Sequence, residues 1–274
     1  MHALFLLTAC VSIAAVALIC IYLLGSGIPT IGEIGLGNFF GGVWKPSKGL
    51  YGIAPMIVGS LYVTAGAMVV GVPLGLLTAV FLARFCPKRL YRLLKPAVNL
   101  MAGIPSIVYG FFGLVVLVPL MQALTGASGK GLLTASLLLG IMILPTITAV
   151  AESALRAVPE NYYEGSLALG ATRERSVFSV TLPAAASGVL SGVILGLGRA
   201  IGETMAVIMI AGNQPIFPRG LLQGLRTMTA NIVIGMGYAT GLHRRALIAT
   251  GVVLFVFILL INACFTLLKR RDAK

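Results

Sequence analysis

Residues 132–155 read LLTASLLLGIMILPTITAVAESAL, a run of 24 residues with one charged side chain, Glu152. A helix that crosses a lipid bilayer needs ~20 consecutive, mostly apolar residues at about 1.5 Å of rise each, so this run is long enough for one crossing. We therefore expect an all-α integral membrane protein with six transmembrane helices. The other five predicted spans lie at about 3–24, 55–83, 97–121, 186–211 and 246–268.

The composition of the whole chain supports this fold class. Of its 274 residues, 58% are hydrophobic and only 10% are charged, and the mean hydropathy is +1.03. Soluble domains usually carry about 25% charged residues, so this chain has too few charges to cover a water-soluble body. These values exclude a soluble enzyme, a disordered chain and a secreted disulfide scaffold.

The basic residues predict the orientation of the helices. With the N-terminus inside, 12 of the 20 Lys and Arg residues fall in inner loops and the tail, 7 fall in outer loops, and Arg199 falls within a span. Because Lys and Arg accumulate in cytoplasmic loops, both termini of this multi-pass protein of the cell (inner) membrane are expected in the cytoplasm. The bases stand in short clusters between uncharged runs, which argues against a nucleic-acid partner despite the net charge of +13.

Several incomplete motifs leave no site for covalent chemistry. The segment around Lys130 lacks the first glycine and the hydroxyl of a phosphate-binding loop, and the four cysteines show neither metal-ligand nor disulfide spacing. Ser128 lies in a GASG segment that resembles the motif of intramembrane serine proteases, with His243 as the candidate base. An intramembrane serine protease and a membrane scaffold without transport remain as alternatives to a transporter.

The segment between the fourth and fifth spans is polar and too long for a tight turn. We expect a short helix over 162–170, closed by Gly170 as a C-cap signal, with Pro183 ahead of the next span. A cytoplasmic helix on a protein with so few polar loops indicates docking to a soluble partner. The charged residues that make this segment polar are Glu160, Glu164, Arg173, Glu174 and Arg175.

The spacing in this segment resembles the EAA loop of ATP-binding-cassette (ABC) importer permeases, E-A-A-x3-G-x9-I-x-L-P. The pattern is matched except that Gly165 and Ser166 replace the two alanines and Val180 replaces the isoleucine. The resemblance implies that this segment docks on an ATPase. The residues implied are Glu164, Gly165, Ser166, Gly170, Leu182 and Pro183.

Four further stretches narrow the resemblance to the PstC-like permeases of phosphate-specific importers, which are binding-protein-dependent type 1 permeases. The stretches are Leu195–Val207 (LGLGRAIGETMAV), Ile104–Phe111 (IPSIVYGF), Pro73–Ala79 (PLGLLTA) and Trp44-x-Pro46 ahead of Tyr51–Ile53. The family implies a type I ABC importer permease fold and the import of inorganic phosphate, with another small oxyanion as the alternative. The expected organisation is a first transmembrane helix with a short periplasmic loop over 1–54, a permease domain over 55–268 and a basic cytoplasmic tail over 269–274.

The same resemblance implies a set of partners. They are a second permease subunit (PstA-like), an ATPase dimer (PstB-like) and a periplasmic phosphate-binding protein (PstS-like), all acting at the lipid bilayer. ATP and Mg are then bound by the partner ATPase. This chain is expected to hold no cofactor or metal and to be a transporter subunit rather than an enzyme.

The fifth span places two charged residues among glycines. At about 100° per residue, Arg199 and Glu203 share a helix face with Gly188, Gly192 and Gly196. Small residues at this spacing permit close approach of a second helix, which the family's pairing would place on the partner permease. We expect the charged pair to point away from lipid.

Charged side chains within a membrane are costly and indicate function. Arg199 offers a planar guanidinium fork to an oxyanion, so Arg199 and Glu203 are the predicted substrate-pathway residues. Glu203 either partly neutralises Arg199 from position i+4 or is protonated through desolvation. The alternative for both residues is a structural ion pair that holds two spans together.

Overall fold

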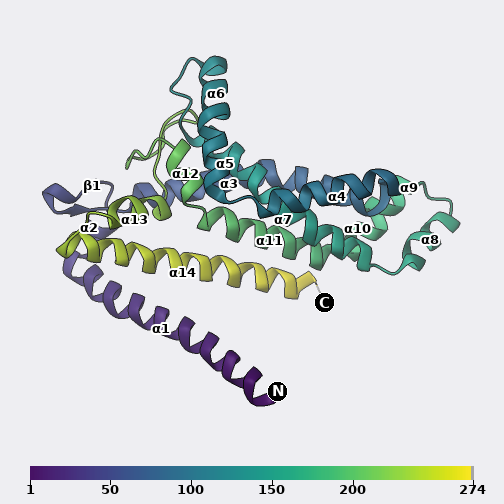
Figure 1. The fold of residues 1–274 in the computed structure, drawn as a ribbon, viewed down its shortest axis with the longest axis horizontal. Helices are drawn as coiled ribbons and strands as arrows, with labels where there is room; N and C mark the ends of the chain where they lie inside the picture. Colours follow the sequence, from purple (N-terminus) through teal and green to yellow (C-terminus); the bar gives the residue numbers. More distant parts are fainter. Residues whose placement is uncertain (273–274) are drawn as a thin grey trace.

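Four long helices run beside one another along the length of the molecule in this computed structural model, which describes residues 1–272 (Figure 1). The end of the predicted basic tail, at 273–274, lies outside the described residues. The four helices are α3 (Ala54–Val80), α7 (Leu132–Ala157), α11 (Ala186–Gly202) and α14 (Gly241–Asp272).

Shorter elements connect these helices, and α1 lies at an angle to them. In chain order they are α1 (His2–Ile34), α2 (Leu36–Phe39), β1 (Trp44–Lys45), the 3-10 turn η1 (Pro46–Lys48), β2 (Leu50–Tyr51), the π-helical η2 (Phe81–Phe85), α4 (Lys88–Gly103), α5 (Ser106–Phe112), the π-helical η3 (Gly113–Leu117), α6 (Val118–Thr125), α8 (Glu160–Ala168), α9 (Arg173–Ser176), the π-helical η4 (Val177–Thr181), α10 (Leu182–Ala184), α12 (Met205–Ile210) and α13 (Met228–Met236). The two strands pair antiparallel, with Trp44 opposite Tyr51.

Close packing of α3 on α7 forms the centre of the bundle. Glycines allow this approach: a Cβ added to Gly71 would lie 2.8 Å from the carbonyl oxygen of Gly140. The Thr148 hydroxyl donates a hydrogen bond of 3.1 Å to the carbonyl of Gly75, which joins the two helices further along. Packing through small residues and interhelical hydrogen bonds is typical of membrane helices, because lipid supplies little hydrophobic drive between them.

The number of spans agrees with the prediction of six. Five helices are long and apolar enough to cross a membrane, and a sixth span results if α9–α10 and α11, which are bent by 74°, count as one. The first and last helices are longer than the predicted 3–24 and 246–268, since they cover His2–Ile34 and Gly241–Asp272. The fold class of a six-span, all-α membrane protein is confirmed.

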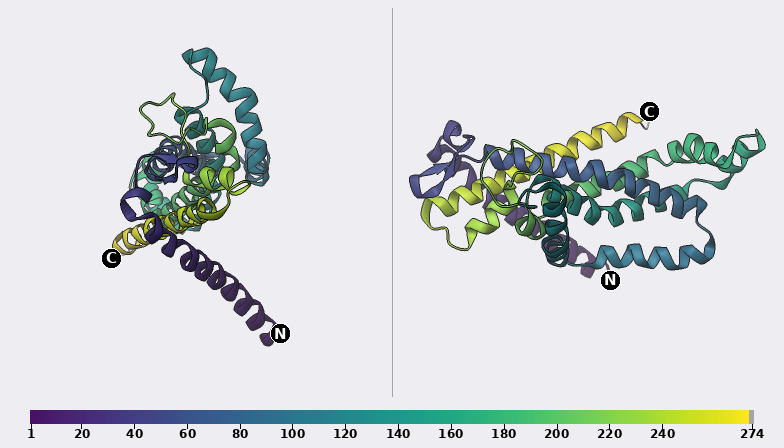
Figure 2. Two further views of the ribbon diagram at one scale, coloured as in Figure 1. Left: turned by 90° about the vertical axis from the view of Figure 1, so that its left-hand side faces the viewer. Right: turned by 90° about the horizontal axis from the view of Figure 1, so that it is seen from above.

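Two predicted spans are broken in the structure. The span predicted at 97–121 divides at Ile104, which is extended before Pro105; proline lacks an N–H and disfavours helical backbone in the residue before it. The candidate span there is Ser106–Thr125, and α6 stands at a steep angle to the long helices (Figures 1 and 2). The span predicted at 186–211 ends at Gly202 and resumes as α12 after Glu203 and Thr204.

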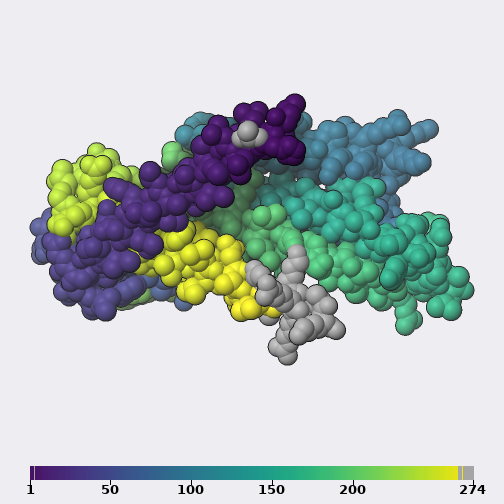
Figure 3. Space-filling view, turned by 90° about the horizontal axis from the view of Figure 1, so that it is seen from below, coloured from purple at the N-terminus to yellow at the C-terminus, as the bar shows by residue number. Residues whose placement is uncertain are grey.

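The two ends of the bundle differ in structure. Helices α8 and α9 lie at one end, whereas the β1–β2 hairpin, α2 and the turn between α13 and α14 lie at the other (Figures 1 and 2). Helix α1 meets α14 at the hairpin end and diverges from it towards the N-terminus, so that it forms a separate rod on the surface (Figure 3). Its most apolar 18-residue stretch, within Leu4–Ile34, has no buried residue.

Candidate functional site

Helix α8 forms the projecting part of the predicted ATPase-docking segment. It covers Glu160–Ala168, so it begins two residues earlier than the predicted helix and ends before Gly170. Gly170 has a φ of +86°, and the N–H of Ala171 reaches back 3.2 Å to the carbonyl of Ser166. This geometry closes the helix through a left-handed glycine, which confirms the predicted role of Gly170 as its C-cap signal.

The six predicted docking residues divide into an exposed group and a group that faces the protein. Glu164, Gly165 and Gly170 are exposed on or after α8, beside Leu169, whose side chain is 91% exposed. In the inward group, the Ser166 hydroxyl accepts a hydrogen bond of 2.9 Å from Ser176 at the end of α9. Serine in place of the usual alanine thus ties α8 to the segment that follows it.

Leu182 and Pro183 lie where the chain turns into the fifth span. Leu182 packs against a buried cluster that includes Val158 and Val177, and Pro183 is exposed. The bend of 74° follows at Ala185. These two residues therefore join the docking segment to α11, and through it to Arg199.

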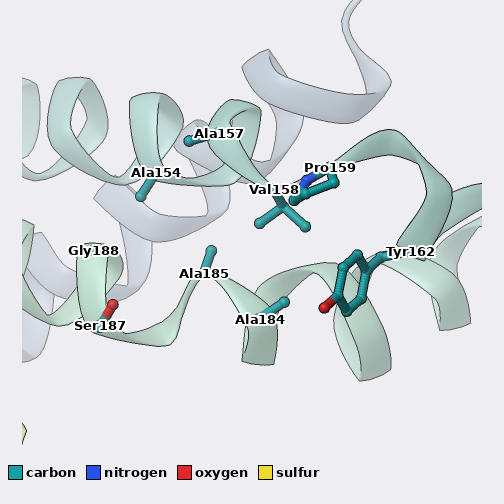
Figure 4. A pocket seen from close by; sticks show the side chains of 9 residues that line it. All are labelled: Ala154, Ala157, Val158, Pro159, Tyr162, Ala184, Ala185, Ser187 and Gly188. Atoms are coloured by element: carbon teal, nitrogen blue, oxygen red, sulfur yellow. The ribbon is translucent and has the colours of Figure 1, made fainter. Parts of the chain in front are cut away.

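A cavity of about 520 Å³ lies beneath the start of α8. Its wall is formed by the end of α7 and by the α10–α11 bend, with the ring of Tyr162 at one side (Figure 4). Most of the lining side chains are small, so α8 is separated from α11 at this point rather than packed on it. The lining residues are Ala154, Ala157, Val158, Pro159, Tyr162, Ala184, Ala185, Ser187 and Gly188.

Arg199 lies near the end of α11 and contacts α7. Its Nη1 donates a hydrogen bond of 3.3 Å to the hydroxyl of Thr146, and its side chain is partly exposed. The four ion pairs found among the described side chains include neither Arg199 nor Glu203. Within the described part of the chain, Arg199 therefore has no ion-pair partner.

Glu203 does not occupy the predicted position on the helix face. Because α11 ends at Gly202, Glu203 is extended, with φ −68° and ψ 133°. Its Oε1 accepts a hydrogen bond of 3.1 Å from the N–H of Ala206 in the first turn of α12, and its carbonyl accepts one of 2.9 Å from Thr229. No ion pair joins Arg199 to Glu203 among the described residues, and the Glu203 carboxylate instead accepts from an N–H at a helix start.

The glycine face of α11 packs within this chain rather than on a partner. A Cβ at Gly196 would lie 2.7 Å from the Ile147 side chain, and a Cβ at Gly192 would lie 3.2 Å from Val150 Cβ, both on α7. The expectation that this face meets the second permease was therefore wrong. A Cβ added to Gly198 or Gly202 would meet no atom within 4 Å, so the open face of α11 is on their side.

A buried ionic cluster near the end of α7 was missed in the sequence. Glu152 is 2% exposed and binds Lys95 at 2.7 Å, Arg156 at 2.9 Å and the Tyr91 hydroxyl at 2.8 Å. This hydrogen bond to the carboxylate raises the pKa of Tyr91 on α4. The available signal was an acidic residue within an apolar run, but its partners on α4 lie 57 and 61 positions away.

The cluster continues to the docking helix through arginine side chains. Arg156 donates to the carbonyl of Leu82 at 2.7 Å, and Arg84 donates to the carbonyl of Leu155 at 3.2 Å. Arg84 also forms an ion pair of 2.7 Å with Glu160, the first residue of α8. The ends of α3, α4 and α7 are thus joined to the start of α8.

The protease alternative has no support in the geometry. The Ser128 hydroxyl donates to the carbonyl of Lys130, and His243 packs against the rings of Trp44, Tyr51 and Tyr238. No hydrogen bond joins Ser128 to His243 among the described residues, so the nucleophile–base contact that this chemistry needs is not formed.

Comparison with known proteins identifies the class. Residues 71–273 match the model of the binding-protein-dependent transport system inner membrane component family. Solved structures with the same fold include the inward-facing MetNI methionine ABC transporter, with a TM-score of 0.66 and 24% identity over 85% of this chain and 100% of that chain. A bacterial alginate ABC transporter bound to its periplasmic protein gives a TM-score of 0.70 and 17% identity over 98% and 96%.

This chain belongs to the binding-protein-dependent transport system inner membrane component family, and its fold is that of a type I ABC importer permease. Within the family it is similar to the phosphate transport system permease protein PstC of Xylella fastidiosa, with 35% identity over 96% of this chain and 89% of the relative. It is 40% identical to the probable ABC transporter permease protein YqgH of Bacillus subtilis over 80% of this chain and 74% of the relative. The predicted PstC-like ABC permease is confirmed, and the protein is a multi-pass membrane protein rather than an enzyme.

Proposed function

We propose that this chain is a permease subunit of an ATP-driven importer that carries inorganic phosphate across the cell membrane. The observation that carries the proposal is the similarity, over almost the whole chain, to permeases named for phosphate transport. Arg199 near the end of α11, which forms no ion pair with the described side chains, supports it, because guanidinium binds oxyanions in a bidentate manner. Uptake of labelled phosphate in cells without another high-affinity phosphate importer tests it. Uptake of labelled sulfate without uptake of labelled phosphate would instead indicate another oxyanion.

The proposal includes three partners, each with its own role. A PstA-like permease completes the pathway, a PstB-like ATPase dimer binds ATP and Mg, and a PstS-like extracytoplasmic protein delivers phosphate. We place the second permease against the open side of α11, where Gly198 and Gly202 have free space beside them. We place Arg199 and Glu203 in the pathway, and Glu164, Gly165, Ser166, Gly170, Leu182 and Pro183 in coupling to the ATPase. The permease domain is proposed to cover 55–268, without a cofactor of its own.

Both termini are proposed to lie in the cytoplasm, and labelling with an impermeant thiol reagent checks this orientation. Native Cys86 lies just before α4, at the end of the bundle proposed to be cytoplasmic, whereas Ser128 lies in a predicted outer loop. In intact cells, Ser128→Cys is expected to react and Cys86 is not. A variant without Cys86 serves as the background in which Ser128→Cys is labelled. Reaction at position 86 but not at position 128 would show the reverse orientation.

Replacing Gly170 by alanine is expected to weaken coupling of ATP hydrolysis to uptake. A Cβ there meets no neighbouring atom, so the effect comes from the backbone, where φ of +86° costs an L-residue about 1 kcal/mol or more. The end of α8 should then be redirected, and coupled uptake should fall several-fold while the protein stays in the membrane. Gly165→Ala isolates the effect of the backbone, because it adds the same methyl group to a helical glycine with equal space. Wild-type coupled uptake in Gly170→Ala would reduce α8 to a linker.

A further inference from the structure

A cavity of about 600 Å³ opens at the end of the bundle opposite α8. The β1–β2 hairpin, the loop after α12 and the turn between α13 and α14 surround it. In the proposed orientation this cavity, called here the outer pocket, faces the extracytoplasmic side. Its lining residues are Trp44, Pro46, Ser47, Tyr51, Pro215, Arg226, Tyr238, Thr240 and His243.

The lining of the outer pocket offers hydrogen-bond donors and a permanent positive charge. Arg226 supplies the guanidinium group, and hydroxyl groups and one indole N–H come from the serine, threonine, tyrosine and tryptophan side chains. None of the lining residues is acidic. At this end of the molecule Glu33 is already paired with Arg245 at 2.7 Å.

Arg226 is held in one orientation without a counter-charge. Its Nε donates to the carbonyl of Asn213 at 2.9 Å, and its Nη1 donates to Oδ1 of Asn231 at 3.2 Å. Both acceptors are neutral, and these two bonds leave Nη2 of the guanidinium fork for a further acceptor. Burial lowers the pKa of Arg226 because it disfavours the charged form, and an anion beside the guanidinium would offset this effect.

Unsatisfied polar atoms gather around this arginine. Asn231 is 1% exposed, yet its Nδ2 has no hydrogen-bond partner in the described structure. Oδ1 of Asn213 and Nε2 of His243 are also buried without partners, and His243 lines the outer pocket. Most buried polar atoms in proteins are hydrogen-bonded, so the Nδ2 donor of Asn231, on a residue that binds Arg226, and the ring nitrogen of His243, in the lining of the outer pocket, are atoms that a polar ligand can satisfy.

We propose that the outer pocket is a second binding site for a small tetrahedral oxyanion, held by Arg226 before the anion reaches Arg199. An anion with acceptors on all sides suits a lining of donors without carboxylates. The inference rests on the proposed function, since the anion is taken to be the transported one.

The structure connects the outer pocket to the predicted pathway through α13. Asn231, which orients Arg226, lies two residues after Thr229, whose hydroxyl donates to the carbonyl of Glu203. The first turns of α13 thus bind both Arg226, through Asn231, and the backbone of Glu203, through Thr229. Lys45, Lys48 and Arg244 add positive charge around this end of the molecule, which raises the local concentration of anions.

Structure determination of the complete importer with molybdate, a tetrahedral oxyanion that scatters strongly, tests the site directly. We expect molybdate density at hydrogen-bond distance, about 3 Å, from the Arg226 guanidinium. The density should be lost in Arg226→Gln and kept in the matched control Arg244→Gln, which removes a neighbouring charge outside the lining. Tyr238→Phe removes only a hydroxyl from the lining and should lower the occupancy without loss of the fold.

Measurements of phosphate uptake and of binding-protein association distinguish an anion-binding site from a protein-docking contact. In reconstituted importer, Arg226→Gln is expected to lower phosphate uptake about fivefold to tenfold while the extracytoplasmic binding protein associates as with the wild type. Absence of molybdate at Arg226 in the wild-type protein would overturn the proposal. Loss of binding-protein association in Arg226→Gln would also overturn it, in favour of a docking role. If the wild-type importer carries no phosphate, the proposed function fails, and this result does not depend on whether molybdate density is found.

Discussion

Replacing Arg199 by glutamine is expected to lower phosphate uptake by at least about tenfold while the importer still assembles. Hydrogen bonds to charged groups contribute about 1.5–3 kcal/mol each, and every 1.4 kcal/mol corresponds to a factor of about ten. Arg199 has no ion-pair partner in the described structure, so its charge is available to the proposed anion. Arg199→Lys should also impair uptake, because lysine cannot offer a bidentate fork.

Two controls define what this result means. Thr146→Ala removes the one side-chain hydrogen bond that Arg199 forms with the described residues but keeps the charge, and at 3.3 Å that bond is long, so uptake should fall far less. Co-purification of the ATPase measures assembly. If Arg199→Gln transports at the wild-type rate, Arg199 is not in the pathway. If the variant fails to assemble, its contact with α7 is structural.

Replacing Glu152 by glutamine is expected to destabilise the protein by about 3 kcal/mol, which should be visible as a lower Tm in detergent. Removal of one member of a buried ion pair commonly costs about 3–5 kcal/mol, because its partner is left uncompensated. The lower end applies here, since the side chains of Lys95 and Arg156 are 26% and 45% exposed and reach some solvent. Coupled uptake should fall as well, because the cluster joins α4 and α7 to the start of α8.

Glu174→Gln is the matched control for this prediction. Glu174 is exposed on α9 in the same polar segment and belongs to none of the ion pairs observed in the described structure, so its loss should change the Tm little. Tyr91→Phe should have an intermediate effect, because it removes one hydrogen bond and no charge. A Glu152→Gln protein with wild-type Tm and uptake would show that the cluster has no structural role.

The sequence was most informative where a local pattern dictates the backbone. Long uncharged runs predicted the spans, and a glycine at a helix end predicted the positive φ at Gly170, because both signals act within one turn or one helix. Pro105 carries a local signal as well, but the prediction of one span at 97–121 did not take it into account. The helix breaks after Gly202, where the Glu203 carboxylate accepts a hydrogen bond from the first turn of the next helix. A regular periodicity of 100° per residue assumes an unbroken helix and so does not represent this break.

Contacts between distant segments were the part that the sequence could not supply. The glycines of α11 predicted close packing correctly, yet they did not specify that α7 of the same chain is the neighbour. Two partners of Glu152, Tyr91 and Lys95, lie on the amphipathic helix α4 far away in the sequence, and single-sequence spacing gives no signal for such contacts. For the same reason the sequence predicted no role for three residues of the outer segment, Arg226, Asn213 and Asn231.

The two anchors of α8 have a mechanical consequence. Its first residue is bound to Arg84 at the end of the second span, and Ser166 is bound to Ser176 ahead of the fifth span, while Leu169 at the tip projects 91% exposed. A displacement of the tip by the proposed ATPase would therefore act on both anchors at once. It would reach the second and fifth spans together rather than one of them alone.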